Sequence, residues 1–70
     1  MTQCEMIVDY INRYGSITDV EAYADLGIRR LAARISDLKD QGYNIKSVGE
    51  TGKNRFGKKT HYTRYSWEDQ

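Results

Sequence analysis

Residues 21–42 read EAYADLGIRRLAARISDLKDQG and contain two short helical patterns that meet at a glycine. Three residues lie on one helical face before the turn: Ala22, Tyr23 and Leu26. Three more repeat at i, i+4 and i+7 after it, the spacing of one buried stripe: Leu31, Ile35 and Leu38. Gly27 can adopt the positive φ that a sharp turn between helices needs. The stretch therefore predicts two helices, the second over about residues 29–41.

This pattern is the sequence form of a helix-turn-helix, whose second helix enters the major groove of DNA. On the outward face of that helix, Arg30 and Arg34 lie one turn apart, and the small Ala33 beside them lets the helix approach base edges. Because arginine can bind O6 and N7 of guanine, we predict base contacts by these three residues. Arg29 and Ser36 flank the row and are predicted to contact phosphates.

The net charge of +1 conceals a strong polarity along the chain. Residues 1–28 carry five acidic and one basic residue, a net −4, while residues 29–64 carry ten basic and three acidic residues, a net +7. A chain polarised in this way can present one basic face to DNA. The alternative is chance clustering on an ordinary solvated helix face, with Arg34 paired to Asp37.

The composition argues against several other classes of protein. The chain of 70 residues predicts a single domain over 1–70 with a small core. We expect no membrane segment and no secretion signal, and the single Cys4 fits a reducing cytoplasm. One cysteine and one histidine cannot supply the four ligands of a structural zinc site. Without a nucleophile–base pair or a phosphate-binding glycine loop, we expect no catalytic residue, no enzyme activity and no cofactor.

Two capping boxes predict the start of the first two helices. Thr2 with Glu5 opens a helix that Gly15 ends, and Thr18 with Glu21 opens a second helix over about residues 19–25. The first helix has an apolar stripe made of Cys4, Ile7, Val8, Ile11 and Tyr14. The link Ser16-Ile17 is predicted to be extended, in the place where winged domains often form a minimal strand.

The C-terminal part predicts a β-hairpin, which we call the wing. Its strands are expected at residues 43–48 and 60–67, before a short polar end at residues 68–70. A turn at Asn54–Gly57 would pair Lys53 with Lys58 and Val48 with Thr63. The basic segment 52–59 is predicted to contact the DNA backbone through four residues: Lys53, Arg55, Lys58 and Lys59. The alternative is a flexible basic loop without a partner.

Several runs carry a resemblance to a known family: Gly15-Ser16-Ile17-Thr18, Glu21-Ala22, Leu26-Gly27-Ile28, RLAARI at 30–35, Asp37-Leu38, Gly42-Tyr43-Asn44-Ile45 and Lys53-Asn54-Arg55-Phe56-Gly57-Lys58. Over about residues 7–65, the chain resembles small winged helix-turn-helix proteins common in bacteriophages and prophages. The resemblance implies DNA binding and a role in transcription regulation or recombination. One position departs from the family, which often has Thr or Ser where this chain has Arg29. A lost helix cap there costs about 0.5–2 kcal/mol.

The sequence therefore predicts an α+β fold, a three-helix winged helix-turn-helix with a C-terminal hairpin, that binds double-stranded DNA. The main alternative is a phage module that inhibits a host protein through acidic residues of the first half: Asp9, Asp19, Glu21 and Asp25. RNA binding is a weaker alternative, because the chain lacks a paired aromatic motif for stacking bases. A homodimer is also open, since tyrosines and Trp67 near the C-terminus could pair across two copies.

Overall fold

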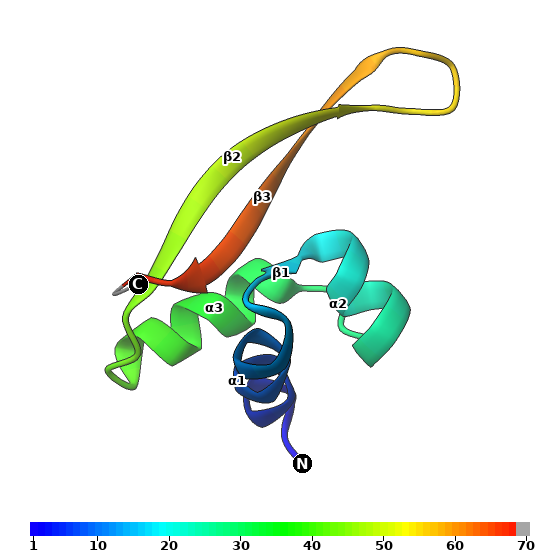
Figure 1. The fold of residues 1–70 in the computed structure, drawn as a ribbon. Coiled ribbons are helices and arrows are strands. Elements are labelled where there is room, and N and C mark those ends of the chain that lie inside the picture. The colour runs from blue at the N-terminus through cyan, green and yellow to red at the C-terminus, as the bar shows by residue number, and fades with distance from the viewer. Residues whose placement is uncertain (69–70) are drawn as a thin grey trace.

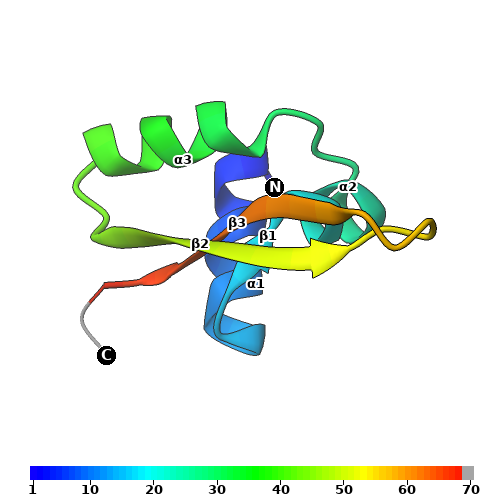
Figure 2. The same cartoon turned by 90° about the horizontal axis from the view of Figure 1, so that it is seen from above.

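The computed structural model describes residues 1–68 and contains three helices beside a three-stranded antiparallel sheet (Figures 1 and 2). The elements follow one another as α1 (Gln3–Tyr14), β1 (Ile17–Thr18), α2 (Asp19–Leu26), α3 (Leu31–Asp40), β2 (Ile45–Lys53) and β3 (Lys59–Trp67). This is the predicted winged helix-turn-helix, with β2 and β3 as the wing. The polar end predicted at residues 68–70 lies outside the described residues except for Glu68, whose amide donates to the Asn44 carbonyl at 2.9 Å.

Both predicted capping boxes are present. At α1, the Glu5 amide donates to the Thr2 hydroxyl at 3.1 Å, and the Thr2 amide donates to the Glu5 carboxylate at 2.8 Å. At α2, Thr18 and Glu21 make the same reciprocal pair at 3.3 and 2.9 Å. Each box satisfies two backbone amides that would otherwise lack partners at a helix start.

Helix α3 is shorter than predicted. It begins at Leu31 and ends at Asp40, so the predicted range 29–41 is wrong at both ends. Arg30 occupies the N-cap position with φ −120° and ψ 65° and makes no side-chain cap hydrogen bond. The guanidinium has no acceptor atom, so it cannot cap the amides, and the chain enters the helix only after the turn is complete. Gly42, with φ 101°, closes the other end, where the Tyr43 amide donates to the Leu38 carbonyl at 3.1 Å.

The core lies between the three helices and the base of the sheet. It consists of Ile7, Tyr10, Ile11, Ile17, Ala22, Ile28, Leu31, Ile35, Leu38, Ile45 and Tyr65. The predicted stripe of α3 is buried, but the placement of two tyrosines was wrong: Tyr14 is 68% exposed and Tyr23 is 58% exposed. Tyr10 fills the core instead, because its ring packs beside Ile7 and Ile11 while its hydroxyl reaches the Asp25 carboxylate at 2.6 Å.

The sheet has the order β1-β3-β2, so the predicted minimal strand pairs with β3. The predicted register of the wing is wrong by one residue, because Lys53 lies opposite Lys59 and Val48 opposite Arg64. Its loop covers five residues, Asn54–Lys58, whereas the prediction closed it within four. Strand β2 also begins at Ile45 rather than at residue 43.

The wing projects well beyond the helices, past α2 and away from α3 in both ribbon views (Figures 1 and 2). The molecule is accordingly elongated, with extents of 39 × 25 × 21 Å. Within residues 1–68, no helix has the length and apolar character needed to cross a membrane.

Candidate nucleic-acid interface

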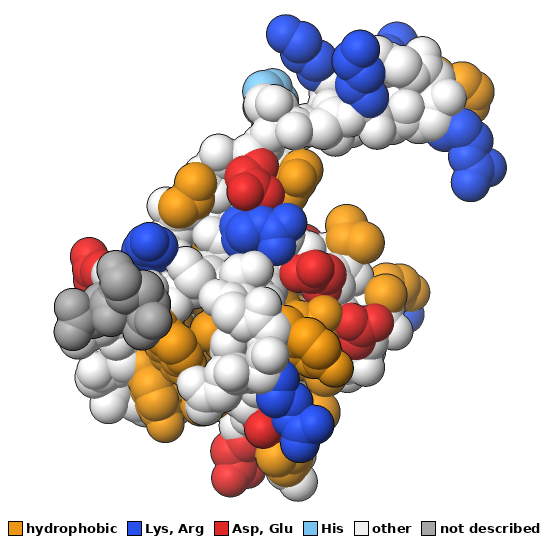
Figure 3. All heavy atoms as spheres, in the orientation of Figure 1, with side chains coloured by type: hydrophobic (Ala, Val, Ile, Leu, Met, Phe, Trp, Pro, Cys, Tyr) orange, Lys and Arg blue, Asp and Glu red, His pale blue; other side chains and the backbone are white. Residues whose placement is uncertain are grey.

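The tip of the wing is a cluster of exposed cations. Lys53, Arg55, Lys58 and Lys59 are all exposed, and none of them forms a salt bridge with any other described residue. In the space-filling view, Lys and Arg side chains gather at the far end of the hairpin, with no acidic side chain among them (Figure 3). No acidic residue occurs between residues 51 and 67. The tip therefore presents uncompensated positive charge to solvent.

One asparagine side chain fixes the shape of this tip. The Asn54 side-chain oxygen accepts from the amides of Phe56 and Lys58, at 2.9 and 3.0 Å. The backbone amide of Asn54 donates to the Lys58 carbonyl at 2.9 Å, and the Gly57 amide donates to the backbone carbonyl of Asn54 at 3.0 Å. Gly57 has φ 80°, in the left-handed region that favours glycine. The basic tip is thus a hydrogen-bonded loop rather than an unstructured one.

A second basic cluster lies where α3 begins. Arg29, Arg30 and Arg34 line one shallow hollow together with Gln3 and Gly27, and we call these three arginines the arginine cluster. Arg29 also lies over the exposed ring of Tyr23, with 6.0 Å between its guanidinium carbon and the ring centroid. The structure thus brings together three of the five α3 residues predicted to contact DNA.

Within the arginine cluster, Arg34 is the least exposed side chain and the one that forms an ion pair. Its guanidinium lies 3.1 Å from the Asp37 carboxylate. This is the ion pair expected if α3 presented an ordinary solvated face. Its Nε is buried and has no hydrogen-bond partner among residues 1–68. Arg30, by contrast, is exposed at the helix start. Arg34 therefore lies on a flank of α3 and not at the centre of its exposed face.

The centre of that exposed face is partly different from the prediction. Ser36 is exposed as expected, whereas Ala33 is half-buried. Ala32 and Lys39 are exposed on the same side as Ser36, since residues three and four apart on a helix are neighbours. Sequence reasoning missed Lys39, although its spacing of three residues from Ser36 was a usable signal.

The base of the wing is tied to α2 by Arg64 of β3. Its Nε donates to the Glu50 carboxylate at 2.8 Å, and its Nη1 donates to the Ser16 hydroxyl at 2.9 Å. Nη1 also lies 3.7 Å from the Glu21 carboxylate that caps α2. The hydrogen bond from Arg64 holds the pKa of Glu50 below its ordinary value and raises the pKa of Arg64. Arg64 thus belongs to the scaffold, although its charge counted toward the net +7 of residues 29–64.

A further hydrogen bond connects the base of the wing, at the C-terminal end of β3, to α1. The indole of Trp67 donates from Nε1 to the Asn12 side-chain oxygen at 2.8 Å, and its ring stacks on Tyr43 at 5.8 Å between centroids. Asn12 is exposed on α1 and accepts this bond from the wing. The hairpin is therefore held at its base and free at its tip.

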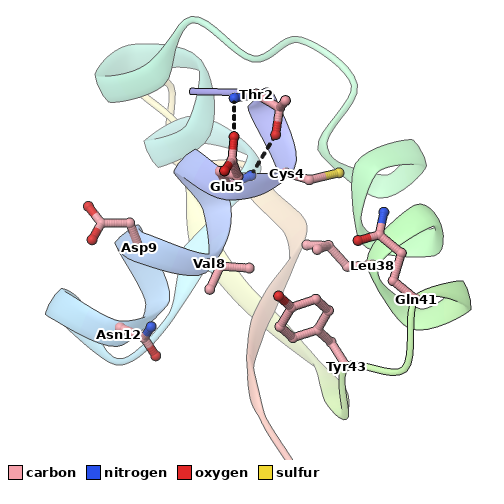
Figure 4. Close-up of a pocket in the computed structure, with 9 residues that line it drawn as sticks. All are labelled: Thr2, Cys4, Glu5, Val8, Asp9, Asn12, Leu38, Gln41 and Tyr43. Atoms are coloured by element: carbon pink, nitrogen blue, oxygen red, sulfur yellow. Dashed lines mark hydrogen bonds between the residues drawn. The ribbon is translucent and has the colours of Figure 1, made fainter.

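The hollow between α1 and the C-terminal end of α3 has a different character (Figure 4). It is lined by Thr2, Cys4, Glu5, Val8, Asp9, Asn12, Leu38, Gln41 and Tyr43. Two carboxylates and no lysine or arginine line it, and Glu5 is engaged in the cap of α1. This hollow is electrostatically unsuited to a phosphate, so the candidate surface consists of α3 and the wing.

The arrangement of helices, turn and hairpin agrees with the comparison with protein families. Residues 2–69 match the family of winged helix-turn-helix domains, and the chain belongs to this family. Membership in it indicates DNA binding. No curated protein and no solved structure gives a significant match to the chain.

Proposed function

We propose that this protein binds double-stranded DNA, with α3 in the major groove and the wing on the backbone. The observation that carries the proposal is the unpaired charge of the wing tip, four exposed cations on a hydrogen-bonded loop that no acidic residue compensates. The family supports the same partner. Such a cluster gains affinity by displacing counterions from phosphates.

Two groups of residues take different roles. Arg30 and Arg34, with Ala33 beside them, are proposed to face base edges. Phosphate contacts are proposed for Arg29, Ser36, Lys53, Arg55, Lys58 and Lys59, and the exposed Lys39 joins them. Arg29 has a physical reason for this role, because a phosphate at the start of α3 would satisfy amides that no side chain caps.

A salt titration of binding to duplex DNA tests the proposal. Each phosphate contact contributes about −0.9 to the slope of log affinity against log salt concentration. The double variant Lys58→Gln/Lys59→Gln should therefore reduce the slope by up to about 1.8 without changing the preferred sequence. Arg13→Gln is the control, because Arg13 lies on α1 and pairs with Asp9 at 3.0 Å. An equal effect of both variants would mean that overall charge, and not the wing, governs binding.

The particular role is proposed from the resemblance to phage and prophage proteins: regulation of transcription or assistance to recombination in a bacterial host. Selection of bound sequences from a random duplex pool would test this proposal. An enriched site supports sequence-specific regulation, and the spacing of any repeated half-sites reports whether two copies bind together. Retention of the pool without enrichment would contradict it.

A host protein as partner is the second candidate. Asp19 lies beside the exposed side chains of Val20 and Tyr23 on α2, and Arg29 borders the same hollow, which gives a mixed charged and apolar surface that could contact a protein. The other acidic residues of this hypothesis have partners within the fold: Asp9 with Arg13, Glu21 with Thr18 and Arg64, and Asp25 with Tyr10. Absence of any duplex affinity at moderate salt would favour this candidate over DNA.

A further inference from the structure

The wing tip carries a large apolar side chain that the fold does not use. Phe56 is 85% exposed, as exposed as Met1 at the chain start. Burial of a phenylalanine side chain is favourable, and this ring contributes nothing to the core. Because the ring has no polar atom, its exposure serves no hydrogen bond. The ring is therefore available to a partner surface.

The loop presents this ring in a defined place. The Phe56 amide donates to the Asn54 side-chain oxygen, and Gly57 follows with φ 80°, so the backbone on both sides of the ring is held. A held loop loses less conformational entropy on binding than a mobile one. The ring thus stands at the end of a narrow two-stranded projection from the domain (Figure 1).

The positive charges around Phe56 favour a polyanion as the partner that covers it. Lys53, Arg55, Lys58 and Lys59 lie within three residues of the ring on either side. An apolar ring among cations fits a surface that offers stacked, uncharged rings between rows of phosphates, which is the floor and rim of a DNA groove. Proteins that bind the minor groove insert apolar side chains between base steps and kink the duplex by about 20–90°.

We propose that Phe56 is a minor-groove wedge, which unstacks one base step beside the major-groove site of α3 and kinks the DNA. The proposal rests on the proposed function, since it needs duplex binding. Pyrimidine–purine steps are the easiest to unstack, so the wedge should select TA or CA/TG steps at that position. The wing would then contribute sequence preference through deformability, although its cations contact only phosphates.

The test measures DNA bending on a duplex selected by wild-type protein. Dyes at the two duplex ends report the kink by energy transfer, and 2-aminopurine at the wedged step reports unstacking. Wild type should kink the duplex by about 20–90° and raise the 2-aminopurine signal. Phe56→Ala should lose both signals, while Phe56→Leu, another apolar wedge, should retain the kink. Val20→Ala is the matched control, an exposed apolar residue on α2 that should change neither signal.

The outcomes separate the proposal from the proposed function. If wild type does not bind duplex DNA, the proposed function fails. If wild type binds but Phe56→Ala kinks the duplex equally, the wedge is overturned while DNA binding stands. Phe56-dependent binding to vesicles of anionic phospholipid, with an unbent duplex, would assign the ring to a membrane surface and overturn the wedge as well. Melting curves of the variants should match wild type, because the ring is outside the core.

Discussion

The hydroxyl of Tyr10 offers a quantitative test of how α1 holds α2. Tyr10 is 9% exposed, and its hydroxyl donates to the Asp25 carboxylate at 2.6 Å. A hydrogen bond to a charged acceptor contributes about 1.5–3 kcal/mol, and the exposure of Asp25 to water reduces this to about 1–2 kcal/mol. We expect Tyr10→Phe to lower the free energy of unfolding at pH 7 by that amount. In a domain of this size, each kcal/mol lowers Tm by about 4–8 °C.

The same bond gives a signed pH dependence. Donation to Asp25, aided by burial, raises the pKa of Tyr10 from 10.0 to about 12. The folded state therefore keeps the proton after the unfolded chain has released it, so stability is full below pH 10 and is lost as the pH rises towards 12. The loss can reach roughly 3 kcal/mol, since each unit of pKa is worth a little over 1 kcal/mol. Tyr10→Phe has no hydroxyl to titrate and so does not lose this stability. The difference in unfolding free energy between it and wild type should therefore vanish at about pH 11.

Urea unfolding followed by circular dichroism at pH 7 and at intervals from pH 9 to 11 measures both effects. Tyr14→Phe is the control at pH 7, because Tyr14 is 68% exposed and should change stability by less than about 0.5 kcal/mol. Equal stability of Tyr10→Phe and wild type at pH 7 would refute the bond to Asp25. A deficit that stays constant up to pH 11 would show that the hydroxyl stabilises the fold but that its pKa is not raised.

Three other substitutions test the core, the loop and the wing base. Ile35→Ala should destabilise by about 2–5 kcal/mol in thermal melts, whereas Ser36→Ala should change little; similar values would mean that α3 is rotated. Gly57→Ala should lower the free energy of unfolding by about 1–2 kcal/mol, because alanine is strained in the left-handed conformation; no neighbouring atom adds a clash to this cost. Gly52→Ala should be tolerated. Arg64→Met should accelerate amide hydrogen exchange where β3 pairs with β1, and unchanged exchange there would show that its bonds are dispensable.

Much of this fold could be predicted because its signals are local. A capping box needs only two residues three apart, so Thr2–Glu5 and Thr18–Glu21 were correct from the sequence. The stripe of α3 was correct because i, i+4, i+7 spacing has one buried face. The tyrosines were harder, since Tyr10 and Tyr14 both fit a helical stripe and only the distant Asp25 decides which one is buried. The wing register failed because one extra loop residue shifts every pair of the ladder.

The candidate site was less predictable, because charge along the chain does not report pairing in space. Arg34 and Arg64 counted equally toward the net +7 of residues 29–64, yet Arg34 pairs with Asp37 and Arg64 binds residues at the base of the wing. The side chains that Arg64 contacts, Ser16, Glu21 and Glu50, lie far from it in sequence. The cations of the wing tip could be identified in advance, since the sequence places no acid near them.

The ties at the base of the wing bear on how such a small domain could recognise DNA. Pairing of β1 with β3, the bonds of Arg64 and the bond from Trp67 to Asn12 all act at the base, while the tip touches no helix (Figure 1). The distance between the tip and α3 is therefore set by the scaffold and not by the ligand. The two arginines that we propose to face bases could distinguish few base pairs by direct contact. With the wing as a second contact, the domain would also respond to the shape and flexibility of the DNA between the two contacts, and this would extend its selectivity beyond the bases it touches.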